Sequence, residues 1–290
     1  MRRRQGLRGW LFVAPALALT GVFFLWPLGL VAWISAHNWP LIGRSRWIGW
    51  QNYVAAWDDE VFRAAVRFTL AYAAGITPVL FIVAFGLALL ANAERRFVGL
   101  FRTVWFLPTS IGISTPSVLW VWMLNGDVGV FTTILNWLGL VQGRVTYLDT
   151  TAAAATAASS MVVWKTAGFT MILLLVGLQA IPRELHEAAR IDGASAWQDF
   201  RHITLPMMRR SLKLALVLSV TGSLLVFDPF YVITRGGPQN GTIRMVYWIY
   251  NSAFVSFRVG YAAALAILLL AMVLTVNLVQ LVLLRDRDEA

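Results

Sequence analysis

Six apolar runs alternate with polar segments along the 290 residues of the chain. Each run reaches or approaches the roughly 20 residues that a helix needs to span the hydrocarbon core of a bilayer. We therefore predict six transmembrane helices, at about residues 10–34, 68–91, 103–124, 151–178, 214–233 and 259–284. Prolines such as Pro78, Pro108 and Pro116 make kinks or short unwound turns available within the runs.

The composition agrees with this pattern. With 59% hydrophobic residues, 13% charged residues and a mean hydropathy of +0.68, the chain cannot bury its apolar surface in one aqueous core. The first run is longer than the roughly 7 to 15 apolar residues of a cleaved signal peptide, which favours an uncleaved signal-anchor helix. No linker or internal repeat divides the sequence, so we expect an all-α integral membrane protein with one transmembrane domain over residues 1–290.

The net charge of +10 raises the question of nucleic acid binding. The basic residues, however, form short clusters beside the apolar runs, and we expect no nucleic acid partner. Most of them lie at the two ends of the chain, in the turn at residues 95–102 and in the long segment after the fourth run. Because cytoplasmic loops carry an excess of Lys and Arg, both termini are predicted to be cytoplasmic.

Several kinds of chemistry are excluded by residues that are missing. The chain has no cysteine, which removes disulfides, thiolate metal sites and a Cys nucleophile. The only lysines, Lys165 and Lys213, do not follow a glycine as a phosphate-binding loop requires. The histidines His37, His186 and His202 are expected as isolated loop residues without metal-ligand spacing. We assign no catalysis and no metal or cofactor to this chain.

The polar insert at about residues 180–210 separates the fourth and fifth runs. Pro182 can open a helix over residues 183–191, and Gly193 fits a left-handed cap. A second short helix, about residues 196–204, is expected to stop before Pro206. Small side chains and mixed charge favour docking of the insert in a groove of another protein. An amphipathic helix lying on lipid headgroups is the alternative.

A tryptophan-rich loop follows the first run, with Trp39, Trp47, Trp50 and Trp57. Tryptophan rings favour the membrane interface, where one edge is apolar and the other is wet. The same residues could instead form an aromatic platform for a sugar. The sequence leaves both interpretations open.

The insert resembles the signature of one family, the permease subunits of binding-protein-dependent ABC importers. The matching positions are Glu187, Ala188, Ala189, Gly193, Ile203, Leu205 and Pro206, with Asp192 and Ala194 beside them. The resemblance implies the type I importer architecture, in which the insert is a coupling helix seated on an ATPase. It also implies the bacterial inner membrane, a second homologous permease, two ATP-binding subunits that hold ATP and Mg, and an extracytoplasmic solute-binding protein.

Further features resemble the branch that imports maltose, oligosaccharides and glycerol 3-phosphate, so a sugar is the implied solute. They are Trp164-Lys165, the stretch from Phe227-Asp228 to Tyr231, and the turn Gly236-Gly237-Pro238. Alignment with the maltose-type permease places seven residues of this chain on its sugar-contacting positions: Lys165, Thr166, Phe169, Ser219, Gly222, Ser223 and Val226. Gly222 replaces an aromatic residue and Ser223 and Val226 replace amides, which suggests a differently shaped or less polar site.

The expected translocation path consists of these seven residues together with Asp228 and Tyr231. Residues 219, 222, 223 and 226 share one helical stripe, although small residues also line ordinary helix crossings in membranes. Lys165 is costly in the membrane unless it is paired or wet. We expect it to line the path, and an ion pair with Asp228 is the alternative.

Two other functions fit parts of the pattern. A secondary transporter driven by an ion gradient would account for the spans and the intramembrane charges, but it would not require the insert and would be expected to show inverted repeats. A scaffold subunit without transport activity would keep the insert and need no polar stripe.

Overall fold

The computed structural model describes residues 12–40, 43–93 and 96–285. The basic clusters at residues 2–8 and at Arg95, and the start of the first predicted run, lie outside these ranges. The chain divides into two compact units, which are described separately: unit 1 comprises Met1–Arg63 and Trp248–Met272, and unit 2 comprises Ala64–Tyr247 and Val273–Ala290. That the chain forms a single transmembrane domain stays a prediction.

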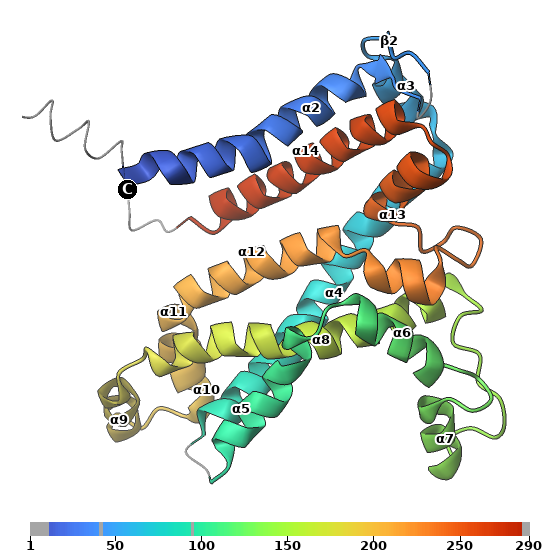
Figure 1. The fold of residues 1–290 in the computed structure, drawn as a ribbon. Helices are drawn as coiled ribbons and strands as arrows, with labels where there is room; N and C mark the ends of the chain where they lie inside the picture. Colours follow the sequence, from blue (N-terminus) through green and yellow to red (C-terminus); the bar gives the residue numbers. More distant parts are fainter. Residues whose placement is uncertain (1–11, 41–42, 94–95, 286–290) are drawn as a thin grey trace, which may run out of the picture. The chain divides into compact units, whose positions relative to one another are not determined.

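The prediction of an all-α membrane protein is confirmed (Figure 1). Within the described ranges, five helices are long and apolar enough to cross a bilayer. They are Phe12–Ser35, Glu60–Asn92, Thr151–Gln179, Arg209–Thr234 and Val259–Leu283. The first contains a π-helical turn, η1 (Gly21–Leu25), followed by α2 (Trp26–Ser35); the second, third and fifth are α4, α8 and α14.

The third predicted span is not one continuous helix. It consists of α5 (Val98–Phe106), a 3-10 turn η2 (Leu107–Ser110) and α6 (Ser114–Met123), and its two halves are bent by 101°. Pro108 supplies no backbone N–H at the break, and Ile111 is extended (φ −87°, ψ 138°). If this bent pair makes one crossing, the described residues hold six spans, as predicted.

The fifth predicted span is also interrupted, contrary to the expected continuous helix over residues 214–233. Helix α12 (Arg209–Leu225) ends at Val226, whose backbone is extended (φ −60°, ψ 130°). A π-helical turn, η4 (Phe230–Thr234), resumes the span after Pro229. The break covers Val226 and Phe227; the chain is helical again from Asp228, and Pro229 lies in this first turn, where its missing N–H leaves no helical hydrogen bond unmade.

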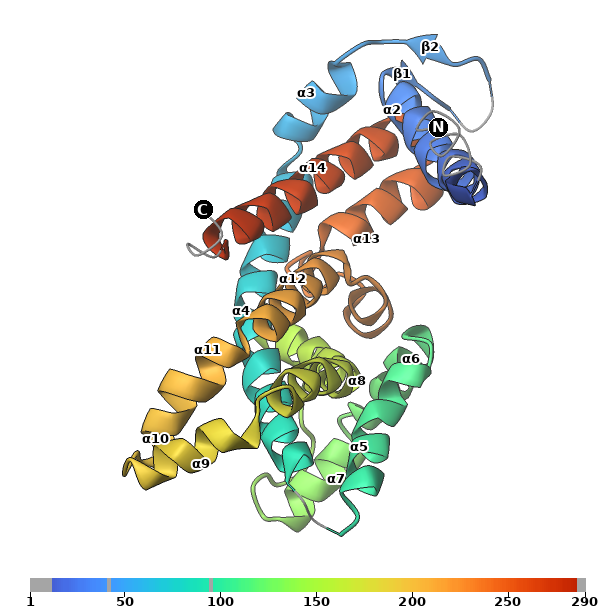
Figure 2. The same ribbon diagram turned by 90° about the vertical axis from the view of Figure 1, so that its left-hand side faces the viewer.

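The core of unit 2 forms where α8 packs against α12 and against α5 (Figures 1 and 2). Gly168 of α8 lies so close to α5 that an added Cβ would overlap the carbonyl group of Trp105. Gly177 lies similarly close to Ser211 of α12. Small residues at helix crossings allow such close approach in membranes. The remaining helices of this unit are α7 (Val130–Trp137), α9 (Arg183–Ile191), α10 (Ala196–Asp199), η3 (Phe200–Thr204) and α11 (Leu205–Met207).

Unit 1 is organised around the carboxylate of Asp59. It accepts hydrogen bonds from the N–H groups of Val61 and Phe62 at 2.9 and 3.2 Å, from Trp248 Nε1 at 2.9 Å and from the Tyr261 hydroxyl at 2.6 Å. Burial alone would raise the pKa of Asp59, but these hydrogen bonds lower the pKa below its ordinary value. The carboxylate thereby connects the start of α4 to the segment that leads into α14.

The other elements of unit 1 are short. Strands β1 (His37–Asn38) and β2 (Arg46–Trp47) pair antiparallel, with His37 opposite Trp47. Helix α3 (Gln51–Asp58) follows them and precedes α4. Helix α13 (Met245–Tyr250) crosses the boundary between the units and is followed by the π-helical turn η5 (Asn251–Val255).

Candidate coupling insert and substrate cavity

The insert forms the predicted first helix, α9, directly after Pro182. Gly193 adopts φ +78°, the left-handed conformation that favours glycine at a helix C-terminus. The second helix differs from the prediction, because it does not stop before Pro206. The π-helical turn η3 follows α10, and Pro206 lies in the first turn of α11, where its missing N–H leaves no helical hydrogen bond unmade.

A capping box starts α10. The Ser195 hydroxyl accepts from the N–H of Gln198 at 3.3 Å, and the Gln198 side chain accepts from the N–H of Ser195 at 2.7 Å. The two interactions satisfy backbone donors that a helix N-terminus leaves free. Ser195 therefore fixes the turn between α9 and α10 as well as providing a small side chain, a role that its spacing from Gln198 would have indicated.

Two contacts hold the insert in shape. His186 Nδ1 lies 2.8 Å from the carboxylate of Asp199, which ties α9 to α10. The ring of Phe200 meets the ring of Phe85 on α4 edge-on, with centroids 5.6 Å apart. Contrary to the expectation of loop positions, His186 lies in α9, His202 in η3 and His37 in β1. The insert is a folded unit, and both views show α9 and α10 together near one end of α8 (Figures 1 and 2).

Three of the seven signature residues, Ala189, Gly193 and Ile203, line an exposed hollow of the insert, together with Asp192 and Ala194 beside them. Glu187 and Ala188 are exposed on α9, and Leu205 and Pro206 are half-buried in α11. A cavity of about 280 Å³ is lined by Ala189, Asp192, Gly193, Ala194, Gln198, Asp199, His202 and Ile203. Small residues at this hollow leave room for a partner's backbone.

Two large apolar side chains of the insert were not singled out in the sequence. Ile191 is 86% exposed and Trp197 is 64% exposed. Large apolar side chains that are exposed together on a folded surface mark contact sites. Their size within an otherwise polar, Ala-rich segment is the signal that would have found them.

The second candidate site is a cavity of about 360 Å³ in unit 2, formed largely by α8, α12 and the segment after α12. Seven of the predicted path residues line it: Thr166, Phe169, Ser219, Gly222, Ser223, Val226 and Asp228. Apolar residues complete the wall, among them Leu80, Ile113 and Phe227. The cavity therefore combines hydroxyl groups, one carboxylate and apolar surface.

The stripe predicted on one helix is only partly helical. Ser219, Gly222 and Ser223 lie on α12, whereas Val226 lies beyond its end in the extended break. Val226 still faces the cavity because the break turns the chain along its wall. At Gly222 an added Cβ would meet no atom within 4 Å, so this glycine is not required by helix packing within the described chain.

Lys165 is not among the residues that line the cavity. Its ammonium group is buried and donates to the backbone carbonyls of Pro108, Thr109 and Ile111, at 3.0, 3.4 and 2.5 Å. These carbonyls belong to the break between α5 and α6. In the ranges that the structure describes, Lys165 forms no ion pair with Asp228.

Asp228 instead accepts a hydrogen bond from the Ser114 hydroxyl, at the start of α6. This bond joins the break in the fifth span to the far side of the break in the third. Tyr231 does not line the cavity, and its ring stacks on Phe227 with centroids 5.0 Å apart. Phe227 does line the cavity, so Tyr231 supports its wall.

Arg244 is a residue that the sequence interpretation missed, having counted it only as a loop charge. It is fully buried, donates from Nη2 to the carbonyl of Ser223, and lies over the rings of Tyr72 and Phe230 at 4.1 and 4.8 Å from their centroids. Burial lowers the pKa of Arg244 to about 10, so the guanidinium stays charged at neutral pH. Arg244 holds the last turn of α12 beside the cavity.

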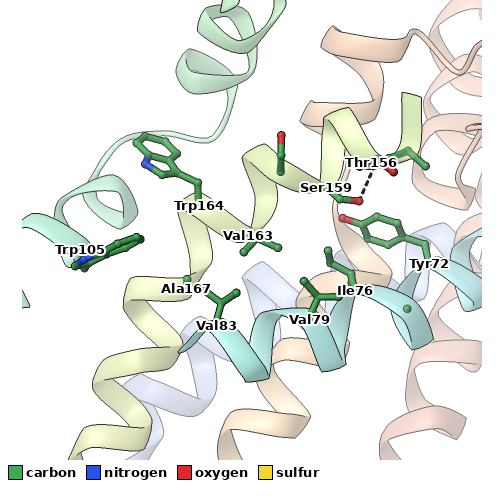
Figure 3. A pocket seen from close by; sticks show the side chains of 13 residues that line it. Tyr72, Ile76, Val79, Val83, Trp105, Thr156, Ser159, Val163, Trp164 and Ala167 are labelled. Carbon is green, nitrogen blue, oxygen red and sulfur yellow. Dashed lines mark hydrogen bonds between the residues drawn. The ribbon is translucent and has the colours of Figure 1, made fainter. Parts of the chain in front are cut away.

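A larger groove of about 620 Å³ lies on another face of α8 (Figure 3). Figure 3 shows Tyr72, Ile76, Val79 and Val83 of α4 opposite side chains of α8. Its wall is mostly apolar and contains no charged residue. The hydroxyls of Thr156, Ser159 and Ser160 in that wall donate to carbonyls of their own helix, and the groove offers no carboxylate, so the smaller cavity is the better candidate for the path.

Comparison with known proteins decides the family. Residues 82–288 match the model of the family described as "Binding-protein-dependent transport system inner membrane component". The chain belongs to this family. The permease is 33% identical to the lactose transport system permease protein LacF of Rhizobium radiobacter, over 99% of this chain and 97% of the relative.

Solved structures agree with this assignment. The permease resembles a chain of a bacterial ABC transporter involved in the import of the acidic polysaccharide alginate, with a TM-score of 0.85 and 26% identity over 98% of this chain and 99% of that one. It also resembles a chain of an alginate ABC transporter in complex with an alginate pentasaccharide-bound periplasmic protein, with a TM-score of 0.83 and 25% identity over 96% and 94%. The predicted type I importer fold is thereby confirmed.

Proposed function

We propose that the chain, as the permease of a binding-protein-dependent importer, forms with a second permease the path for a sugar or sugar-like solute. The observation that carries this proposal is the folded insert, which presents three of the seven signature residues at an exposed hollow. Membership of the permease family supports it. The lactose and alginate systems among the similar proteins support the sugar class.

The insert is the proposed docking site for an ATPase subunit. ATP and Mg are held by two such subunits and not by this chain. Glu187, exposed on α9, would pair with a basic group of the ATPase, while Ile191 and Trp197 supply apolar contact area. ATP-driven closure of the ATPase dimer would move the insert, and Phe200 would pass that motion to α4. This arrangement requires the insert and both termini to be cytoplasmic.

The cavity of unit 2 is the proposed solute path. The hydroxyls of Thr166, Ser219 and Ser223 and the carboxylate of Asp228 can exchange hydrogen bonds with solute hydroxyls. Phe169 and Phe227 offer ring surface to the C–H faces of a sugar ring. The solute would be delivered by an extracytoplasmic binding protein, as in the alginate complex.

Affinity purification of the tagged chain from its native membrane in mild detergent tests the proposal. We expect an ATPase, a second permease and ATP-dependent uptake after reconstitution. Glu187→Lys should lose the ATPase and uptake while the spans stay folded, because the substitution reverses a charge on an exposed helix face. Glu184→Lys, on the same helix but outside the signature, is the matched control. Recovery of the chain alone, with uptake that needs no ATP, would contradict the proposal in favour of a secondary transporter.

A further inference from the structure

Helix α3 is fixed to the end of the first span through one face. Asn52 donates from Nδ2 to the carbonyls of Ser35 and His37, at 2.8 and 2.9 Å. The Tyr53 hydroxyl lies 2.7 Å from the Ser35 hydroxyl, and Ala56 is fully buried. This face leaves α3 little freedom to move relative to the end of α2.

A second face of α3 is apolar and exposed. Trp50, Val54 and Trp57 are 76%, 60% and 75% exposed, and their spacing of four and three residues places them on one stripe. Leaving these side chains in water would cost free energy, because each carries a large apolar area that the described residues do not cover. Gln51 and Asp58 form a third, polar face beyond this stripe.

The connections of α3 place it at a membrane boundary. The first span ends at Ser35 and the second begins at Glu60, so α3 and the paired strands β1 and β2 occupy the segment between two crossings (Figure 2). A helix in this segment with one apolar face and a neighbouring polar face fits the membrane interface, where the surroundings change from lipid to water. Tryptophan is the side chain most favoured at that depth.

We propose that α3 is an interfacial helix that binds phospholipid, with Trp50, Val54 and Trp57 inserted among the headgroups and upper acyl chains. Arg44, before β2, and Arg46, in β2, are both exposed and complement anionic headgroups. Through Asn52 and Tyr53 the helix anchors the end of α2. That span needs such an anchor because its apolar window buries no residue within the described chain.

The chain lacks cysteine, so single cysteines can report the depth of each face. We would attach a nitroxide to Val54→Cys and, as matched control, to Gln51→Cys, each in the full chain in phosphatidylethanolamine–phosphatidylglycerol nanodiscs. Collision with oxygen reports lipid and collision with a nickel chelate reports water. The oxygen-to-nickel ratio should be higher at residue 54 than at residue 51.

Equal access of the nickel chelate to both positions would overturn the proposal. So would water access at residue 54 that is lost on adding maltohexaose or a solute-binding protein, because that result assigns the stripe to a sugar or a protein. A second measurement guards against labels that distort the helix. In Trp50→Ser/Trp57→Ser, quenching of the remaining tryptophan fluorescence by brominated lipid should fall only slightly, because the other tryptophans stay in place. A label at Ala36→Cys, at the end of α2, should by contrast become clearly more accessible to the nickel chelate. Unchanged accessibility of a label at Ala36→Cys in this variant would also contradict the anchoring role.

Discussion

In both interrupted spans of unit 2, a basic side chain from another segment donates to backbone carbonyls at the break. The two spans differ in which side chain does so and in how many hydrogen bonds it makes. Each break frees backbone carbonyls, and each is met by a cation from another segment. Lys165 of α8 binds the break between α5 and α6, and Arg244 binds the last turn of α12. Broken helices are tolerated at membrane depth only where protein or water satisfies the freed groups.

The cations differ in how well they are satisfied. Lys165 has three carbonyl acceptors. Arg244 has one carbonyl and two ring faces, and its Nε and Nη1 have no hydrogen-bond partner among the described residues. The comparison teaches that a buried cation can serve the backbone of a broken helix, from within a span as Lys165 does or from the segment after one as Arg244 does, so a lysine in a span does not by itself mark the solute path.

The same substitution at both cations tests this difference with the largest expected effect. Lys165→Met should destabilise the protein by about 2 to 3 kcal/mol, because the carbonyls of Thr109 and Ile111 lose their donor, whereas the carbonyl of Pro108 keeps the N–H of Ile111. Arg244→Met should cost only about 1 to 2 kcal/mol, because it strands one carbonyl while removing two unpaired N–H groups. Denaturant unfolding in detergent micelles measures both.

Lys165→Arg is the control for charge, and it should recover part of the stability lost in Lys165→Met. A larger loss at Arg244 than at Lys165 would break the comparison. Unaltered stability in Lys165→Met would show that water, and not the lysine, donates to the carbonyls at the break between α5 and α6.

The next largest effect on stability is expected from a Gly→Ala substitution, which adds a methyl group next to a break. Gly168→Ala should destabilise by about 1 to 3 kcal/mol, because its Cβ would overlap the carbonyl of Trp105 next to the first break. Gly222→Ala, near the second break, should leave stability unchanged, because its Cβ meets no atom within 4 Å. Equal unfolding midpoints for the two variants would show that α8 does not approach α5 this closely.

The hydrogen bond that joins the two breaks should have the smallest effect. Ser114→Ala removes the donor to Asp228 and should cost roughly 0.5 to 1 kcal/mol, since the bond is exposed. Ser117→Ala is the control for loss of a hydroxyl from the same helix, because Ser117 donates to the carbonyl of Ile113 four residues earlier and not to the second break. If Ser117→Ala lowered the free energy of unfolding as much as Ser114→Ala, the Ser114–Asp228 hydrogen bond would have no special role in joining the two breaks.

The sequence predicted the parts of the fold that depend on local properties. Apolar length located the spans, and Pro182 and Gly193 bounded α9. Pro108 indicated that a kink was available near the first break, but whether the breaks at Ile111 and Val226 would form could not be predicted, because each requires a distant cation to reach the freed carbonyls. Sequence patterns carry no information on such long-range pairing.

The candidate site shows the same division. The residues around the α12 stripe could be placed on the cavity because one helix sets their spacing. Lys165 could not, because the direction of a long side chain at the crossing of α8 and α5 depends on which carbonyls the neighbouring break exposes. Arg244 was missed because the chain folds its loop back against Tyr72 and Phe230, which no local pattern indicates.

The most direct test of the account asks whether the unit 2 cavity is the path. Thr166→Cys faces this cavity and Ser159→Cys faces the groove of Figure 3; both are half-buried on α8, and both hydroxyls donate to a carbonyl four residues earlier. Labelling by a water-soluble thiol reagent would be measured in the reconstituted complex with and without ATP. The account predicts labelling at residue 166 that changes with ATP and little labelling at residue 159. ATP-dependent labelling at residue 159, with none at residue 166, would contradict it.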